Sequence, residues 1–193
     1  MISSASVYSL ADEQRARADA AAWSRFTAPV DGAEFYAAWL SLLAARVLRA
    51  RNALLLLAND DGQSFAVSAV WPDAQRDLQY LGPTAQRALS ERRGVVAIAD
   101  GTGAQADGGA QVAYPIELGD TLCGAVVLEV GSGSGTDLQA ALREVHWGIA
   151  WLVDRFREQL QQRDRAEAQR MALVNTLMAA ALQHRKVQSS ALA

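Results

Sequence analysis

Few residues in this chain are of the types that commonly do chemistry, and those few are far apart. The 193 residues include one cysteine, Cys123, and two histidines, His146 and His184. A cysteine nucleophile needs a base within hydrogen-bonding reach, and a zinc site needs several ligands, usually at short spacings. The sequence therefore predicts neither site. We expect Cys123 to be a small buried apolar residue, His146 to lie at the edge of the core or an interface, and His184 to be solvated.

Carboxylates and glycines that stand close together are explained by turns. Asp60, Asp61 and Asp120 lie in Asp-Asp-Gly and Gly-Asp sequences, where aspartate side chains favour the turn itself. The glycine-rich segment from Gly101 to Ala110 lacks the Gly-Lys-Ser/Thr ending of a phosphate-binding loop. We interpret it as a lid over a pocket or as a disordered loop. No catalytic triad or carboxylate pair remains, so an enzyme is not expected.

The composition indicates an ordinary globular protein. Apolar residues make up 51% and charged residues 20% of the chain, which is long enough to bury roughly 70% of its unfolded surface. A net charge of −3 provides no general attraction to nucleic acid. No signal peptide is recognisable, no apolar stretch reaches the ~20 residues of a membrane helix, and a single cysteine fits a reducing compartment. We expect a cytoplasmic protein without a cofactor.

Helix signals dominate the N-terminal part. A first helix is expected between Ser9, which starts a Ser-x-x-Asp capping box, and Pro29, which breaks it. Asp31 and Glu34 form a second box and open another helix. Apolar residues recur along this helix at steps of three and four, which predicts one buried face: Phe35, Trp39, Leu42, Leu43, Val47 and Leu48.

Strand signals follow. The apolar run from Asn52 to Asp60 predicts a strand buried on both faces, and the alternating run from Ser64 to Trp71 predicts its hairpin partner. The alternation places Phe65, Val67, Ala69 and Trp71 on one side. Gly82 and Pro83 are expected to start a helix that stops at Gly94, before a further strand over 95–100.

A hairpin is predicted around Gly119 and Asp120, because glycine suits the first central position of a two-residue turn. Counting back from this turn pairs residues across the two strands. Directly opposed residues share one face of the sheet. Both faces are mostly apolar, so we expect helices to cover both of them. One face would carry Leu118 with Thr121, Ile116 with Cys123, Tyr114 with Ala125, and Val112 with Val127; the flatter face would carry Glu117 with Leu122, Pro115 with Gly124, Ala113 with Val126, and Gln111 with Leu128.

The last third is predicted to be helical, with a Thr136-x-x-Gln139 cap at its start. Trp147 and Trp151 form a stripe beside a longer heptad-like one, and either stripe can pack on the flat sheet face or on a partner helix. After a polar stretch over 161–170 the helix either continues to about Gln188 or bends. The longer stripe consists of Leu138, Leu142, Val145, Ile149, Leu152, Phe156 and Leu160, and Met171, Val174, Leu177, Met178 and Leu182 resume the spacing.

This arrangement resembles a GAF domain. The resemblance covers roughly residues 31–156 and is carried by Pro115-Ile116, the Gly119-Asp120 turn and the step from Cys123 to Val126. It implies an α+β, profilin-like fold with an antiparallel sheet of about five or six strands between helices. It also implies a role in small-molecule sensing and dimerisation. The segments AAWLSLLAARV and WGIAWLVDRFRE are similar to a bacterial subgroup attached to membrane-fusion proteins of secretion systems.

Departures from the specialised GAF families narrow the expected function. The phosphodiesterase type carries an Asn-Lys-Phe-Asp-Glu set, which is excluded because Lys186 is the only lysine. Bilin-binding domains usually have a histidine after the attachment cysteine, and none follows Cys123. Methionine sulfoxide reductases of this fold use several cysteines, and one does not complete that cycle.

The resulting prediction divides the chain into an N-terminal helix (1–30), a GAF-like sensor (31–160) and a helical linker or dimerisation segment (161–193) leading to a further domain. A structural dimerisation module with a degenerate pocket is the alternative. The expected homodimer would pair through the terminal helices, by way of Leu142, Val145, Ile149, Leu152 and Phe156. The expected small-molecule pocket is lined by Trp71, Tyr80, Val112, Tyr114, Cys123 and Ala125.

Overall fold

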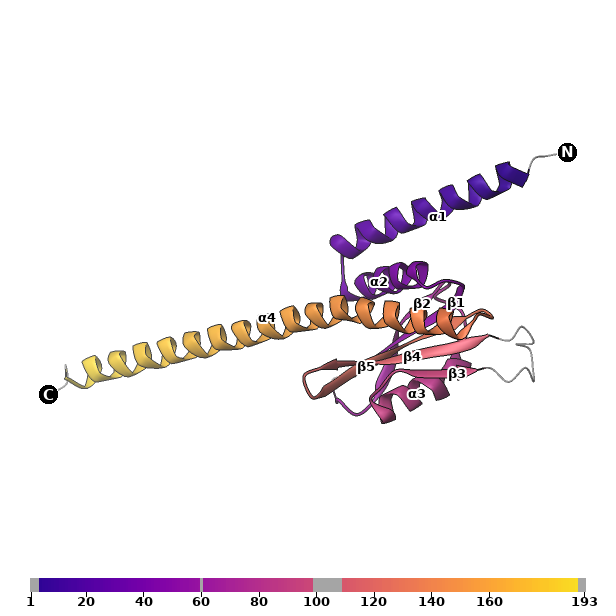
Figure 1. The fold of residues 1–193 in the computed structure, drawn as a ribbon. Coiled ribbons are helices and arrows are strands. Elements are labelled where there is room, and N and C mark those ends of the chain that lie inside the picture. The colour runs from indigo at the N-terminus through magenta and orange to yellow at the C-terminus, as the bar shows by residue number, and fades with distance from the viewer. Residues whose placement is uncertain (1–3, 60, 99–108, 191–193) are drawn as a thin grey trace. The chain divides into compact units, whose positions relative to one another are not determined.

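The computed structural model (Figure 1) describes residues 4–59, 61–98 and 109–190, with side chains described over 16–59, 61–98 and 109–179. The chain divides into two compact units, Met1–Val153 and Asp154–Ala193. The predicted turn residue Asp60, most of the glycine-rich loop and the side chains of Leu182, His184 and Lys186 lie outside the described parts. The elements are α1 (Ser4–Thr27), α2 (Gly32–Arg46), β1 (Ala50–Ala58), β2 (Phe65–Trp71), η1 (Gln79–Leu81), α3 (Gly82–Glu91), β3 (Val95–Ile98), β4 (Ala110–Leu118), β5 (Thr121–Val130) and α4 (Gly135–Ser190).

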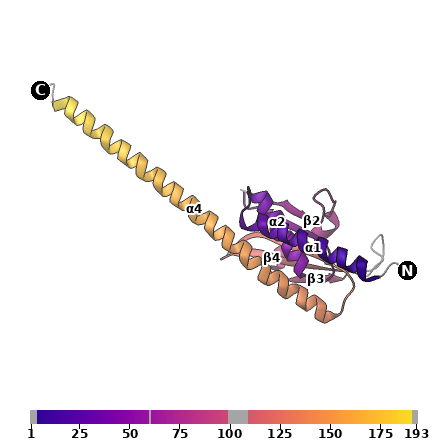
Figure 2. The ribbon, with the colours of Figure 1, turned by 90° about the horizontal axis from the view of Figure 1, so that it is seen from above.

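The first unit is an antiparallel sheet between helices, as the sequence predicts. The described strands form a five-stranded sheet in the order β2-β1-β5-β4-β3. Helix α2 and the start of α4 cover one face, and η1 with α3 covers the other (Figures 1 and 2). We call these the α2/α4 face and the α3 face. The prediction of an α+β fold with both sheet faces covered is confirmed.

The second predicted capping box is present at the start of α2. The Asp31 carboxylate accepts a hydrogen bond from the Glu34 backbone N–H at 2.7 Å, and the Glu34 carboxylate accepts one from the Val30 N–H at 2.7 Å. The first predicted box is wrong as a helix start, because α1 begins at Ser4, before Ser9. Leu48 lies beyond the end of α2 and is 66% exposed, so it is not part of the predicted apolar face.

A β-bulge changes the side-chain alternation predicted for β2. Leu55 pairs with Ala69 and Leu56 pairs with Val67, so Ser68 is an extra residue in the strand. An extra residue shifts every following side chain to the other face. Val67 is consequently exposed and Ala69 is buried, although the sequence places them on the same side.

A second bulge lies next to the β4–β5 turn. The turn itself is confirmed: Leu118 pairs with Thr121, and Gly119 adopts a left-handed φ of 61°. Glu117 then pairs with Leu122, but Ile116 pairs with Gly124, which leaves Cys123 as the extra residue. Every predicted pair beyond the bulge is therefore wrong by one position; the observed pairs are Pro115 with Ala125, Tyr114 with Val126, Ala113 with Val127, Val112 with Leu128 and Gln111 with Glu129.

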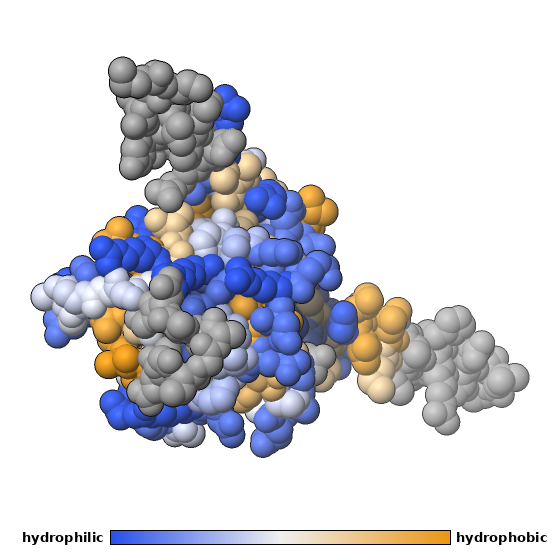
Figure 3. Space-filling model, turned by 90° about the vertical axis from the view of Figure 1, so that its right-hand side faces the viewer, coloured by the Kyte–Doolittle hydropathy of each residue, from blue (hydrophilic) through white to orange (hydrophobic). Residues whose placement is uncertain are grey.

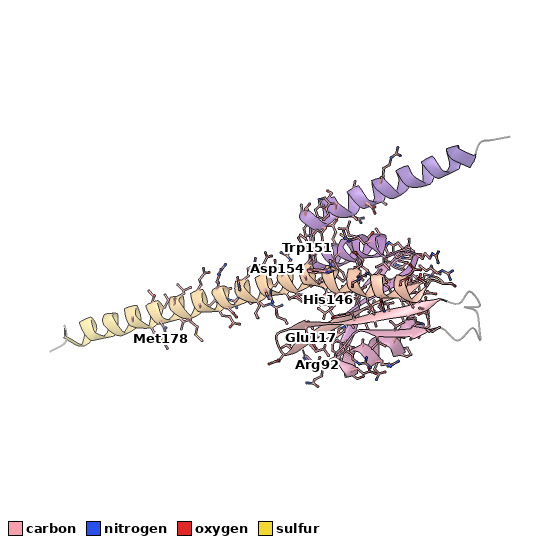
Figure 4. All side chains as sticks on the ribbon, viewed as in Figure 1. Arg92, Glu117, His146, Trp151, Asp154 and Met178 are labelled. Carbon is pink, nitrogen blue, oxygen red and sulfur yellow. The ribbon has the colours of Figure 1, made fainter. Side chains whose placement is uncertain are left out.

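Helix α3 covers the flat sheet face, where the sequence analysis also considered a stripe of the C-terminal helix. Its small buried residues Ala85 and Ala88 belong to the same apolar cluster as Ala113 of β4. The helix ends at Glu91, and the left-handed cap is Arg92 with φ 51°, where the sequence predicts Gly94. Arg92 also pairs with Glu117 at 2.6 Å, and both residues are labelled beside the sheet in Figure 4.

Helix α4 is capped two residues before the predicted Thr136 box. The Ser134 N–H donates to the Asp137 carboxylate at 2.8 Å, and the Ser134 hydroxyl accepts from the Asp137 N–H at 3.3 Å. Hydrogen bonds from the backbone and the side chain of Ser134 lower the pKa of the Asp137 carboxyl. Assigned helix is continuous from Gly135 to Ser190, and among the described residues no helix is long and apolar enough to span a membrane.

Candidate functional site

The bulge at Cys123 separates the residues that the sequence groups into one pocket. Val112 and Tyr114 point toward the α2/α4 face, together with Trp71, which pairs with Ala53 on the same side. Ala125 points toward the α3 face, because it pairs with Pro115 and Leu56. Tyr80 belongs to η1 on that same face. The six predicted lining residues thus lie on two sides of the sheet and at the bulge between them.

On the α2/α4 face, the surroundings of Tyr114 are packed. Its hydroxyl is 2.8 Å from Nδ1 of His146, which points from α4 toward the sheet (Figure 4). A Cβ added to Gly94 would lie 3.0 Å from the Tyr114 ring and 3.2 Å from Leu142, so the neighbouring backbone is already in close contact. Val112 is fully buried. His146 is itself exposed, so its place beside Tyr114 fits the predicted edge of the core or an interface.

Cys123 has the environment of an unreactive thiol. It is half-buried in the bulge, with its Sγ atom 3.7 Å from the carbonyl oxygen of Thr121. Partial burial raises the pKa of the Cys123 thiol, and the nearby Glu117 carboxylate raises it further. A thiol with a raised pKa is a poor nucleophile at neutral pH. Within the described residues there is also no cluster of three or more histidine, cysteine or acidic side chains that would hold a metal.

On the α3 face, three polar side chains form a cluster that the sequence analysis missed. Asn52 Nδ2 donates to the Tyr80 hydroxyl at 2.9 Å and to the Glu129 carboxylate at 2.5 Å. The Tyr80 hydroxyl donates to the same Glu129 oxygen at 2.5 Å. We call Asn52, Tyr80 and Glu129 the polar cluster. Nearby, the Thr84 hydroxyl donates to the side chain of Gln111, which is the cross-strand partner of Glu129.

One atom of the polar cluster lacks a partner. Asn52 is only 4% exposed, and its Oδ1 atom is buried without a hydrogen bond. Leaving a buried acceptor unsatisfied costs about 1–3 kcal/mol, and such atoms are rare in folded proteins. Asn52 therefore presents an unused acceptor beside the Glu129 carboxylate, under η1. The available sequence signal was a polar residue in each of two neighbouring, otherwise apolar strands.

The environment of Tyr80 has a testable pH dependence. Burial and the hydrogen bond to Glu129 raise the pKa of Tyr80 to about 12, so its hydroxyl stays protonated and donates at neutral pH. Because the folded pKa exceeds the unfolded value near 10, this stabilisation is complete below about pH 10 and is lost as the pH rises toward 12. The stability advantage of wild type over Tyr80→Phe should therefore shrink between about pH 10 and about pH 12, measured by urea unfolding. An advantage that stayed constant over this range would contradict the assignment.

The helix residues predicted for a dimer interface are mainly core residues. Val145 and Leu152 are fully buried within the first unit, and Ile149 is 6% exposed. They are shielded because this face of α4 packs on the domain, so the prediction that they meet a second chain needs correction. Leu142 is half-buried and contacts the neighbourhood of Gly94. Phe156 belongs to the second unit, and its assignment stays a prediction.

Comparison with known proteins identifies the fold. No model of a known protein family matches the chain, and no curated protein sequence is similar to it. Among solved structures, the GAF domain of A. aeolicus nlh2 in an inactive state aligns with a TM-score of 0.50 and 10% identity, over 77% of this chain and 98% of that one. The second GAF domain of DevS from Mycobacterium smegmatis aligns at 0.41 and 20% identity, over 63% and 96%. The chain has the GAF fold.

Proposed function

We propose that this chain is a sensing module that binds a small molecule at the polar cluster on the α3 face. The observation that carries the proposal is the buried, unpartnered Oδ1 atom of Asn52. Its amide nitrogen is already used by Tyr80 and Glu129, so the free oxygen is held in place and ready to accept a hydrogen bond. A bound molecule that supplied an N–H or O–H donor would remove the cost of the unsatisfied acceptor.

The test is a thermal-shift screen of the full chain with small metabolites, alongside native mass spectrometry for a co-purified molecule. A binder should raise the Tm of wild type, because a ligand that binds only the folded state stabilises it. Asn52→Leu, which keeps the side-chain size and removes the acceptor, should abolish that shift while the domain stays folded. Thr121→Ala, at an exposed turn position, is the control. A screen in which no binder loses its shift in Asn52→Leu would contradict this site.

In this proposal the module also pairs with a second copy of the chain, through the part of α4 that belongs to the second unit. Large apolar side chains on this stretch of helix are 49–69% exposed, which is unusual for an isolated helix in water. They recur mostly at steps of three and four, the spacing with which helices pair. The residues are Met171, Val174, Leu177 and Met178, which the sequence analysis singled out by the same spacing, and Leu173 beside them.

If the chain pairs through this stretch of α4, a charge placed within it should separate the two copies. Val174→Glu places a charge in the predicted seam, so we expect the mass measured by analytical ultracentrifugation to fall from dimer to monomer. Glu167→Gln, on the same helix but outside the apolar stretch, is the matched control and should remain dimeric. The fold of the first unit should be intact in both, because Val174 lies in the other unit. A wild-type chain that sediments as a monomer at all concentrations would exclude pairing.

A structural dimerisation module without a ligand is the second candidate function. It is favoured by the filled surroundings of Tyr114, where the sequence analysis places one side of a pocket. The two candidates differ in the screen: only the sensing module shows a shift that Asn52→Leu abolishes. Both are non-enzymatic and cytoplasmic in this proposal, and both suit a domain attached to a membrane-fusion protein of a secretion system, as the sequence resemblance implies.

A further inference from the structure

A groove lined by aromatic residues lies between three helices, on the side of the sheet opposite the polar cluster. Its volume is about 270 Å³. Trp23 and Phe26 come from α1, Trp39 and Arg46 from α2, and Trp147 and Trp151 from α4. Trp151 lies on the side of α4 that faces α1 (Figure 4), and its ring meets that of Phe26 at 6.0 Å. We call this the aromatic groove.

The floor of the aromatic groove is fixed and apolar. Trp39 is only 3% exposed, and its indole N–H donates to the carbonyl oxygen of Gly148 at 2.9 Å. A Cβ at position 148 would lie 2.7 Å from Leu43, so glycine allows α4 to come this close to α2. Because the Trp39 donor is already used, the floor offers a flat surface and no free hydrogen bond.

The walls of the groove carry exposed tryptophans. Trp23, Trp147 and Trp151 are 54%, 70% and 61% exposed, respectively. Exposed indoles from α1 and α4 are suited to stacking against a flat ring, since aromatic pairs gain about 0.5–1.5 kcal/mol beyond burial. In the view of Figure 3, hydrophilic residues cover much of the surface, and hydrophobic residues form separate patches among them.

The rim supplies a guanidinium with unused N–H donors. Arg46 Nε donates to the Glu144 carboxylate at 2.8 Å, and the arginine side chain is 71% exposed. A guanidinium has five N–H donors, and within the described residues the terminal nitrogens of Arg46 make no hydrogen bond. An incoming carboxylate can therefore bind these terminal nitrogens as a two-pronged pair while Glu144 keeps Nε.

We propose that the aromatic groove is a second small-molecule site, which binds a planar aromatic carboxylate with its rings between the tryptophans and its carboxylate on Arg46. The volume is just below the range of about 300–1,000 Å³ for drug-sized ligands, which suits a two-ring molecule. A whole helix, about 10 Å across, does not fit. The unused terminal N–H donors of Arg46 favour an acid over a neutral ring system, because a carboxylate can accept two of them at once. This site is independent of the polar cluster and of the function proposed for it.

Isothermal titration calorimetry of the full chain with 2-naphthoate tests the proposal, with the neutral 2-naphthamide as the matched probe. Wild type should bind naphthoate more tightly than the amide. Arg46→Gln should weaken naphthoate binding by about ten-fold or more and leave amide binding unchanged, since a hydrogen bond to a charged group is lost. Trp151→Ala should weaken both probes by about ten-fold, because it removes the stacking surface.

The controls separate a site in the groove from other causes. Arg87→Gln removes another exposed, ion-paired arginine, on α3, and should leave naphthoate binding unchanged. Asn52→Leu should also have no effect, which keeps this test distinct from that of the polar cluster. No naphthoate binding by wild type would overturn the proposal, as would binding that survives both Arg46→Gln and Trp151→Ala. It would also be overturned if Trp151→Ala or naphthoate converted a dimer to a monomer, because a second copy would then occupy the groove.

Discussion

Replacing Gly124 with alanine is expected to destabilise the domain by about 3 kcal/mol or more, at the upper end of what overpacking costs. A Cβ at this position would overlap the carbonyl oxygen of Leu56 in the neighbouring strand and lie 3.0 Å from Leu57. The overlap is with backbone, so a rotamer change does not relieve it. Chemical denaturation of the purified chain, followed by circular dichroism, measures the change in unfolding free energy.

Gly135→Ala is the matched control for Gly124→Ala. Gly135 is the first residue of α4, no proline follows it, and an added Cβ meets nothing within 4 Å. Alanine there should therefore be neutral, or stabilising by about 0.4–1 kcal/mol through the unfolded state. Equal stability of the two variants would show that strand β5 does not approach β1 this closely at Gly124.

Leu152→Ala should destabilise the first unit by about 2–5 kcal/mol, the usual cost of a cavity in place of a buried leucine. Leu152 is fully buried in a single chain, although its heptad spacing first places it in a dimer seam. The loss should be the same at low and high protein concentration, because a core cavity does not depend on a partner. Thermal and urea unfolding at several concentrations distinguish the two roles.

Leu160→Ala serves as the comparison for Leu152→Ala on the same helix. Leu160 is 50% exposed, so its replacement should change stability by less than about 0.5 kcal/mol. If Leu152→Ala were harmless to the monomer and instead shifted the dimer to monomer, the burial of this face against its own domain would be wrong.

Local patterns predicted the elements well. The Asp31 box, the apolar run in β1 and the Gly119 turn are each specified by residues close in the sequence, and all three are present. Helix starts were less predictable, because several residues near Ser134 compete to cap α4. The sequence alone does not show which of these residues caps the helix, because the choice depends on where the preceding strand ends.

The pocket was harder to predict than the strands that surround it. A single extra residue at Cys123 reversed the faces assigned beyond it, and moved Ala125 to the side opposite Tyr114. No short pattern marks this bulge, because Leu122, Cys123 and Gly124 are all compatible with a regular strand. Asn52 and Glu129 were missed for a related reason: they become neighbours only when β1 pairs with β5, far along the chain.

The amino-acid order by itself determined the class of fold, since hydrophobic periods of two and of three to four residues arise from the geometry of single strands and helices. It also determined that both sheet faces are covered, because most strands carry apolar residues on both faces instead of alternating apolar with polar ones. Tertiary structure decided which residues share a face, which stripe of α4 is buried and where Asn52 finds its partners. Those outcomes depend on register and close approach between distant segments, where a shift of one residue exchanges the two sides of a strand.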